Sequence, residues 1–199
     1  MQIYAPQTAE EAAEILRTAV KDRIKISIRG FSSQSPAVQN PVTLCTRNFK
    51  HIEPGHPGDL IVSLGAGFPF MQLAQFLPDE VVPPEYAGSL GGCLCGNRTL
   101  PAHRFLIPRI LALTFIRTTG EIIKLGAKSV KDVAGYKIIP LFAGSRGRLG
   151  LVMDITINTA SIFRDLRLRI PLSDYKPSPS MKTLIEGLIR TFDPAGILS

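Results

Sequence analysis

The segment that most constrains this chain is the glycine-rich stretch 88–97, whose residues read GSLGGCLCGN. Backbone this rich in glycine can take positive φ at several positions and carries little side chain to keep a ligand at a distance. Its successive N–H groups can form a concave site for phosphate. The rings of Pro83 and Pro84 make the approach to the stretch rigid. Taken alone, the glycine density favours a surface turn over a phosphate site.

A second candidate phosphate site follows an alternating strand predicted at 24–28. Gly30 allows the backbone to turn there, and backbone amides and serine hydroxyls can donate hydrogen bonds to an anion. The residues of this turn are Arg29, Gly30, Phe31, Ser32 and Ser33. Taken alone, the segment is also typical of an ordinary polar turn.

The chain is basic, with 23 Lys and Arg against 16 Asp and Glu, a net charge of +7 and a pI near 9.6. Such a surface suits nucleic acid, an anionic membrane, a phosphate cofactor or an acidic partner. The cations are scattered, apart from clusters at 104–109, 146–148 and 164–169, and no repeat of basic and aromatic residues appears. We therefore do not expect nucleic-acid binding.

The three cysteines do not form a disulfide framework, because Cys93 and Cys95 are one residue apart and Cys45 is left over. Together with His51 and His56 they also lack the spacing of a zinc site. We therefore predict no bound metal and a reducing, cytoplasmic location. The first residues do not resemble a signal peptide, and no apolar run reaches transmembrane length.

Periodicity predicts an α+β protein with two subdomains. In residues 1–53, a helix at 8–23 with a capping box at Thr8 and Glu11 lies among strands, which predicts a small parallel βαβ layer. Residues 54–172 are expected to form a larger mixed or antiparallel sheet flanked by helices. Residues 173–199 are expected to form a linker and a C-terminal helix that packs on the domain.

Several elements are expected within the larger subdomain. They are a strand at 60–67, a helix that begins at Pro69, a hairpin at 110–125, a short buried helix or turn at 136–143, and strands at 150–157 and 166–170.

Two further motifs resemble a known family. Residues 128–137 read KSVKDVAGYK, and residues 141–152 read LFAGSRGRLGLV. They resemble the signature of FAD-linked oxidases of the vanillyl-alcohol-oxidase and p-cresol-methylhydroxylase (PCMH) type, and most closely that of the FAD-binding subunit of bacterial glycolate oxidase. The order of the other motifs is similar too, and the likeness covers most of residues 1–158 and about 181–198.

The resemblance implies a PCMH-type fold that binds FAD between its two subdomains. The pyrophosphate would lie against the turn at 29–33 and the glycine stretch, and the adenine and ribose near 150–152. The cofactor-binding residues implied are Arg29, Gly30, Phe31, Ser32, Ser33, Pro84, Gly88, Ser89, Leu90, Gly91, Gly92, Leu94, Asn97, Gly150, Leu151 and Val152.

No catalytic residue is predicted, because the sequence shows no paired carboxylates and no triad. His103 is a conceivable base, although a lone histidine in a polar segment is more often simply exposed. Some family members attach FAD covalently through cysteine. We interpret Cys93 and Cys95 instead as small residues that pack beneath the cofactor.

The chain departs from the family in three places. Phe31 and Ser32 stand where members carry the second and third glycines of the first phosphate loop, and a side chain at 31 obstructs close approach if that position needs positive φ. Residues 107–110 read IPRI where members often have an Arg-Asp pair. Only about residues 159–180 occupy the place of the substrate-covering cap domain, and so short a segment cannot enclose a pocket.

Three functions are compatible with these features. The first is the FAD-binding subunit of a glycolate-oxidase-like 2-hydroxyacid dehydrogenase or oxidase, in which the flavin accepts electrons. A cap-bearing or iron–sulfur partner, or a second copy of the chain, would complete its pocket. The second is a structural subunit with a degenerate FAD fold and no flavin. The third is an anion-binding module without a redox role. We expect the first.

Overall fold

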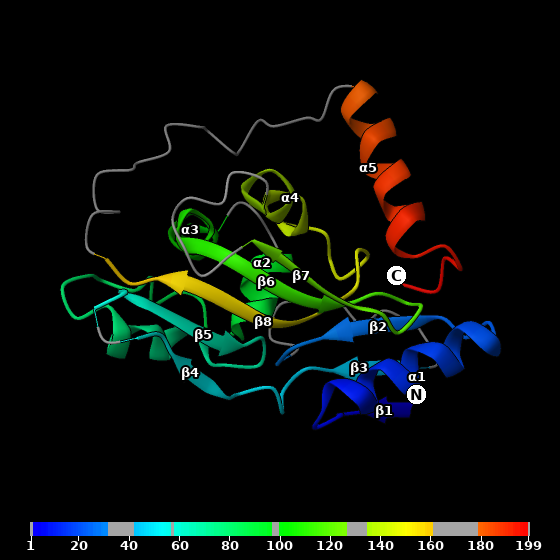
Figure 1. Cartoon of the computed structure of the whole chain (residues 1–199), viewed down its shortest axis with the longest axis horizontal. Coiled ribbons are helices and arrows are strands. Elements are labelled where there is room, and N and C mark those ends of the chain that lie inside the picture. Colours follow the sequence, from blue (N-terminus) through cyan, green and yellow to red (C-terminus); the bar gives the residue numbers. More distant parts are fainter. Residues whose placement is uncertain are drawn as a thin grey trace.

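Two β-sheets organise the molecule, as seen in the computed structural model, which describes residues 2–31, 42–56, 58–96, 100–126, 135–160 and 179–198 (Figure 1). One sheet has three strands in the order β1-β3-β2, and the other has five in the order β4-β5-β8-β6-β7. The strand pairs of the small sheet are parallel and those of the large sheet are antiparallel. The predicted α+β class, with a small parallel layer and a larger sheet, is confirmed.

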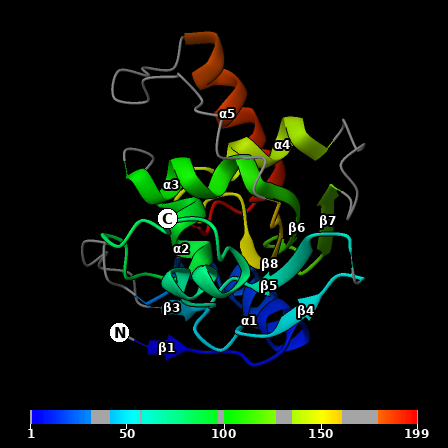
Figure 2. The same cartoon turned by 90° about the vertical axis from the view of Figure 1, so that its left-hand side faces the viewer.

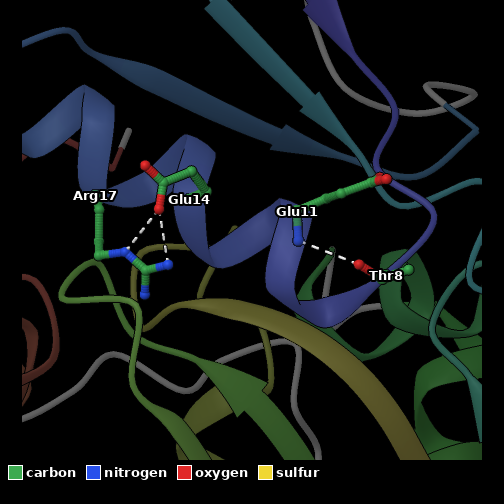
Figure 3. A network of polar contacts seen from close by, with 4 residues as sticks. All are labelled: Thr8, Glu11, Glu14 and Arg17. Atoms are coloured by element: carbon green, nitrogen blue, oxygen red, sulfur yellow. Dashed lines mark hydrogen bonds and ion pairs between the residues drawn. The ribbon is translucent and has the colours of Figure 1, made fainter.

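The small sheet is built from β1 (Gln2–Tyr4), α1 (Ala9–Lys21), β2 (Ile26–Arg29) and β3 (Val42–Cys45). The start of α1 agrees with the predicted capping box: Thr8 Oγ1 accepts a hydrogen bond from the Glu11 amide at 3.2 Å (Figure 3). The Glu11 carboxylate accepts from the Gln7 amide at 2.8 Å. The first turn of α1 is therefore fixed by its own sequence.

Helix α1 packs against both sheets. Its buried residues Ala12, Ala13, Leu16 and Ala19 share one hydrophobic cluster with Ile26 and Leu44 of the small sheet and with Ile116, Leu151 and Met153 of the large sheet. Alanine at three of these four positions allows the helix backbone to approach closely. This cluster fixes one sheet against the other.

The large sheet contains β4 (Ile52–Pro54), β5 (Ile61–Gly65), β6 (Ile110–Ile116), β7 (Ile122–Gly126) and β8 (Leu151–Asn158). Strand β8 lies between β5 and β6, and seven of its eight residues are buried. Its register with β6 shifts between Thr114 and Phe115, because Thr114 pairs with Asp154 and Phe115 with Val152. This bulge places Val152 on the same face as Ile155, so that both reach the second cluster.

The second cluster covers the face of the large sheet opposite α1 (Figure 2). It is formed with η1 (Phe70–Phe76), α2 (Leu90–Cys95), α3 (Pro101–Leu106), η2 (Ile107–Arg109) and α4 (Gly135–Phe142). The helix predicted from Pro69 is a 3₁₀ helix, and Pro69 caps it rather than occupying its first turn. The short buried helix predicted near 136–143 is α4. The strand predicted at 166–170 lies outside the described residues.

The C-terminal segment connects the two sheets. After α5 (Pro179–Phe192), the buried Asp193 carboxylate accepts hydrogen bonds from the Ile197 amide at 3.1 Å and the Leu198 amide at 2.9 Å. The Ile26 amide donates to Ile197 O at 2.8 Å, so the tail extends the β2 edge of the small sheet. Phe192 meets the ring of Phe115 on β6 of the large sheet and the ring of Phe142 at the end of α4.

Helix α5 extends away from the sheets in both views (Figures 1 and 2). Within the described residues, no helix of the chain is long and apolar enough to cross a membrane.

Candidate functional site

Three of the sequence motifs meet where the two sheets join, and we call this junction the seam. A Cβ built on Gly30, just after β2, would overlap the Ser89 hydroxyl, which stands at the start of α2. In the turn 144–150, the Gly144 amide donates to Leu94 O at 3.1 Å and the Arg146 amide to Cys95 O at 2.8 Å. The first turn, the glycine stretch and the turn before β8 are thus in direct contact.

The seam lies at the carboxyl edge of the small sheet. The Thr46 amide, after β3, donates to Arg29 O at 2.8 Å, which joins the ends of β2 and β3. On the large sheet, the Gly67 amide donates to Phe49 O at 2.8 Å, and a Cβ on Gly67 would overlap Thr46 O. Ligands of parallel sheets commonly bind outside the carboxyl ends of the strands. The position of the seam therefore suits a ligand that spans both sheets.

The glycine stretch is not an open loop, because Leu90–Cys95 form an α-helix capped by Ser89. The Ser89 hydroxyl accepts from the Gly92 amide at 3.1 Å. The amides of Leu90, Gly91 and Cys93 donate to Phe68 O, Ala66 O and Ser89 O, each at 2.8 Å. Four consecutive amides are therefore paired within the chain, and they do not form an open concavity in this structure; phosphate binding at this stretch stays a prediction.

The glycines of this stretch make room for the chain itself. A Cβ on Gly92 would lie 2.8 Å from the Tyr86 hydroxyl, and one on Gly88 would overlap the Tyr86 ring. A Cβ on Gly91 would lie 2.9 Å from that of Ala66. Tyr86 is buried, donates to Ser89 O at 3.3 Å and packs edge-on against Phe70 with ring centroids 5.3 Å apart. Close internal packing thus accounts for these glycines.

The thiols beside the glycines are held protonated. Although Cys95 is partly exposed as a residue, burial of its thiol raises the pKa to about 11, against the lowering effect of the Ser145 hydroxyl and the Gly147 amide. Burial, assisted by the charge of Cys95, also raises the pKa of Cys93. Since the thiolate is the nucleophilic form, both cysteines are inert. This agrees with their interpretation as packing residues.

The predicted residues at the start of β8 lie in the cores. Gly150 has φ of +130°, and a Cβ there would lie 2.6 Å from Ile116 O. Leu151 and Val152 pair with Ile116 and Phe115 and point to opposite clusters, with exposed fractions of 0% and 4%. Leu90 and Leu94 of α2 are likewise fully buried. The side chains of these residues are therefore not available to a ligand.

The other predicted residues are dispersed. Arg29 and Phe31 are half-buried at the seam, and Pro84 is exposed in the loop before α2. Ser32, Ser33 and Asn97 lie outside the described residues. His103, expected to be exposed, is buried in α3, because that short helix packs on the large sheet. Arg109, where the family pattern breaks, is buried in an ion pair with Glu80.

Sequence reasoning missed four cations around the seam. Arg47 and Lys50 follow β3, and Arg146 and Arg148 belong to the turn before β8; all four are exposed. Arg47 Nε donates to Cys45 Sγ at 3.1 Å, and the Cys45 thiol donates to Gly30 O at 3.3 Å. Lys50 Nζ lies 5.9 Å from the centre of the Phe31 ring. Their convergence depends on the fold, and the sequence signals only the Arg146–Arg148 cluster.

No protein-family model matches the chain. It is 27% identical over 182 residues to D-lactate dehydrogenase of Archaeoglobus fulgidus, covering 85% of this chain and 41% of the relative. It is 25% identical over 164 residues to an uncharacterized FAD-linked oxidoreductase of Mycobacterium tuberculosis, covering 76% and 36%. The chain is a homologue of the FAD-linked oxidases.

This homologue is also 25% identical over 183 residues to glycolate oxidase subunit GlcE of Escherichia coli, covering 81% of the chain and 51% of that subunit. The resemblance predicted from the motifs is confirmed, although the likeness to GlcE is modest. The chain spans about a third to a half of the length of these curated relatives.

A solved structure of similar fold is 6-hydroxy-D-nicotine oxidase from Arthrobacter nicotinovorans. Its TM-score is 0.60 at 16% identity, and the match covers 78% of this chain and 35% of that one. The fold of this FAD-linked oxidase homologue is therefore of the PCMH type, as predicted.

The donors and cations at the seam can be compared with what the phosphates of FAD require. A dianion needs convergent donors or cations. The glycine-stretch amides are internally bonded, yet four exposed cations surround the turns. The residues therefore fit the phosphate groups through side-chain charge rather than through a glycine cradle.

Proposed function

We propose that this chain is the FAD-binding part of a 2-hydroxyacid dehydrogenase or oxidase related to glycolate oxidase. The observation that carries the proposal is the convergence of the three motif segments at the seam, in a chain whose relatives include D-lactate dehydrogenases and glycolate oxidase subunits. FAD, when bound, supplies the electron acceptor. The residues of the seam bind and orient it, with the turn at 29–33 and Gly88–Gly92 nearest the pyrophosphate.

The substrate pocket requires a further contribution. Residues 159–180, which stand where family members carry the substrate-covering cap domain, are too few to enclose a pocket. We infer that a partner, either a cap-bearing or iron–sulfur subunit or a second copy of the chain, completes a site for a small 2-hydroxy acid. GlcE is itself named as a subunit, which supports an assembly of several chains.

A structural subunit without flavin is the second candidate. It is favoured by the internal pairing of the Leu90–Cys93 amides and by Phe31 in place of a family glycine. In this case the glycines remain because Tyr86 and Ala66 occupy the space beside them.

Titration with FAD, followed by flavin fluorescence, separates the two candidates. The change Gly30→Ala drives a methyl group into the Ser89 hydroxyl and separates the turns. We expect it to weaken FAD binding at least about tenfold, which corresponds to about 1.4 kcal/mol. Gly187→Ala is the matched control, because a Cβ there meets nothing within 4 Å.

A cooperative thermal unfolding transition in each variant is the check that both variants fold. Equal FAD affinity in the two variants would contradict the seam as the site. A native wild-type chain that takes up no FAD would favour the structural subunit.

A further inference from the structure

The exposed cations at the seam make no ion pair with any carboxylate among the described residues. The ion pairs found among the described residues join Arg17 to Glu14, His51 to Asp154, Arg109 to Glu80 and Arg117 to Glu121. Arg47, Lys50, Arg146 and Arg148 are in none of them, and we call these four residues the cationic collar. Like charges placed together without counter-charges repel one another, and an anion relieves that repulsion.

Two contacts hold the collar beside the first turn. Arg47 reaches Gly30 through the Cys45 thiol, since Arg47 Nε donates to Cys45 Sγ and this thiol donates to Gly30 O. Lys50 lies over the ring of Phe31, the residue that replaces a family glycine. Arg47 and Lys50 therefore lie at the carboxyl edge of the small sheet, next to the turn that follows β2.

The other two cations approach the same strand from the turn before β8. Gly147, between Arg146 and Arg148, has φ of +81°, and a Cβ there would lie 3.0 Å from Ile28 Cβ. Arg148 Nε donates to Ser145 O at 3.3 Å, which restrains its side chain within that turn. The collar thus has members on both sides of the end of β2.

The glycine stretch offers an anion no unpaired amide donors at Leu90–Cys93, whereas the collar offers charged side-chain donors. The amides of Leu90, Gly91, Gly92 and Cys93 already have acceptors within the chain, so an anion could recruit them only by breaking those bonds. An arginine or lysine side chain gives a charge-assisted hydrogen bond without that cost. Exposed cations also attract an anion over a distance of about 10 Å at moderate salt.

We propose that the cationic collar, with Arg47 and Lys50 foremost, binds the diphosphate of a nucleotide at the seam in place of the glycine-stretch amides. This inference rests on the proposed function, and it names the residues and the kind of interaction by which the cofactor's phosphates are held. Because the charges are exposed, binding weakens as the salt concentration rises.

The test is calorimetric titration of the whole chain with ADP and with inorganic pyrophosphate, which carry the phosphates without a flavin ring. The double variant Arg47→Gln/Lys50→Gln removes two collar charges and keeps side chains of similar length. We expect it to weaken both ligands at least about tenfold and to reduce the salt dependence. Lys50→Gln alone, which leaves the Arg47–Cys45 contact intact, is expected to give part of the effect in a chain of unchanged stability.

The control is Lys21→Gln/Arg104→Gln, which removes the same two types of charge elsewhere. Lys21 ends α1, and the parallel βαβ connection places that end at the opposite edge of the small sheet. Arg104 is exposed on α3, a helix that takes no part in the contacts described for the seam. The control double variant is expected to bind ADP like the wild type.

Equal affinity in the collar and control variants would overturn the inference. FAD binding without any binding of ADP or pyrophosphate would also overturn it and would leave the proposed function standing. Collar-dependent ADP binding by a chain that does not take up FAD would support the inference and reject the proposed function.

Discussion

Tyr86 explains why glycine stands at positions 88 and 92. Its hydroxyl and ring fill the space where both side chains would begin, and its edge contact with Phe70 fixes it there. The sequence identified the glycines but gave no sign of this partner, because a tyrosine two residues before a glycine has no periodic pattern. The meaning of a glycine-rich stretch thus depends on what packs against it.

The change Gly88→Ala tests this packing. The new methyl group meets the Tyr86 ring, and we expect the free energy of unfolding to fall by about 1–3 kcal/mol. Gly187→Ala, in the open interior of α5, is expected to leave stability unchanged or to raise it by up to about 1 kcal/mol. Urea unfolding measures both, and equal effects would show that Tyr86 does not constrain position 88.

Because the thiol of Cys95 is buried, we expect the protein to lose stability at alkaline pH. Burial raises the pKa of this thiol from about 9 to about 11, so folding favours the protonated form. Its contribution is complete below about pH 9 and is lost as the pH rises towards 11, because the unfolded chain releases the proton first.

Comparison with Cys95→Ala isolates this effect from other titrations. Between about pH 8 and pH 10.5, the unfolding free energy of the wild type should fall relative to that of the variant by about 2 kcal/mol. Parallel pH profiles for the two proteins would exclude the thiol as the cause.

At the scale of elements, the sequence predicted a helix correctly where the capping residues and the apolar pattern lie within the helix itself. Helix α1 was predictable because Thr8 and Glu11 cap it and its apolar stripe has helical spacing. Helix α2 was missed, because glycine disfavours helices and concealed the cap signal of Ser89. Its helical form depends on bonds to Phe68 and Ala66, which only the folded large sheet provides.

The buried ion pair between Arg109 and Glu80 joins the loop after η1 to the start of β6. Arg109 also donates to Phe105 O at 2.6 Å and lies over the Phe105 ring. We expect Glu80→Met alone to cost about 3–5 kcal/mol of unfolding free energy, because it leaves a buried arginine without its carboxylate.

The double variant Arg109→Met/Glu80→Met provides the comparison. It removes both charges, so we expect it to be more stable than Glu80→Met alone. If the double variant loses as much unfolding free energy as Glu80→Met and Arg109→Met lose together, the two residues act independently.

At the scale of the molecule, α1, the seam and the C-terminal tail each connect the two sheets within the part of the chain that the structure describes. The tail joins Phe192, on the large sheet, to Ile197 and Leu198, on the small sheet. The sequence predicted a small parallel layer and a larger sheet, because helical and alternating patterns follow each other along the chain. It did not predict how they meet, since the contacts of Gly30 with Ser89 and of the tail with β2 join residues far apart in sequence.

The proposed function requires that the seam binds FAD. The visible absorption spectrum of the purified whole chain after incubation with FAD and gel filtration tests it most directly. We expect the two flavin bands to travel with the protein in about equimolar amount. We also expect denaturation to release FAD, because burial raises the thiol pKa of Cys93 and Cys95 and so disfavours a covalent link through either. A folded, colourless protein would show that the seam does not bind FAD.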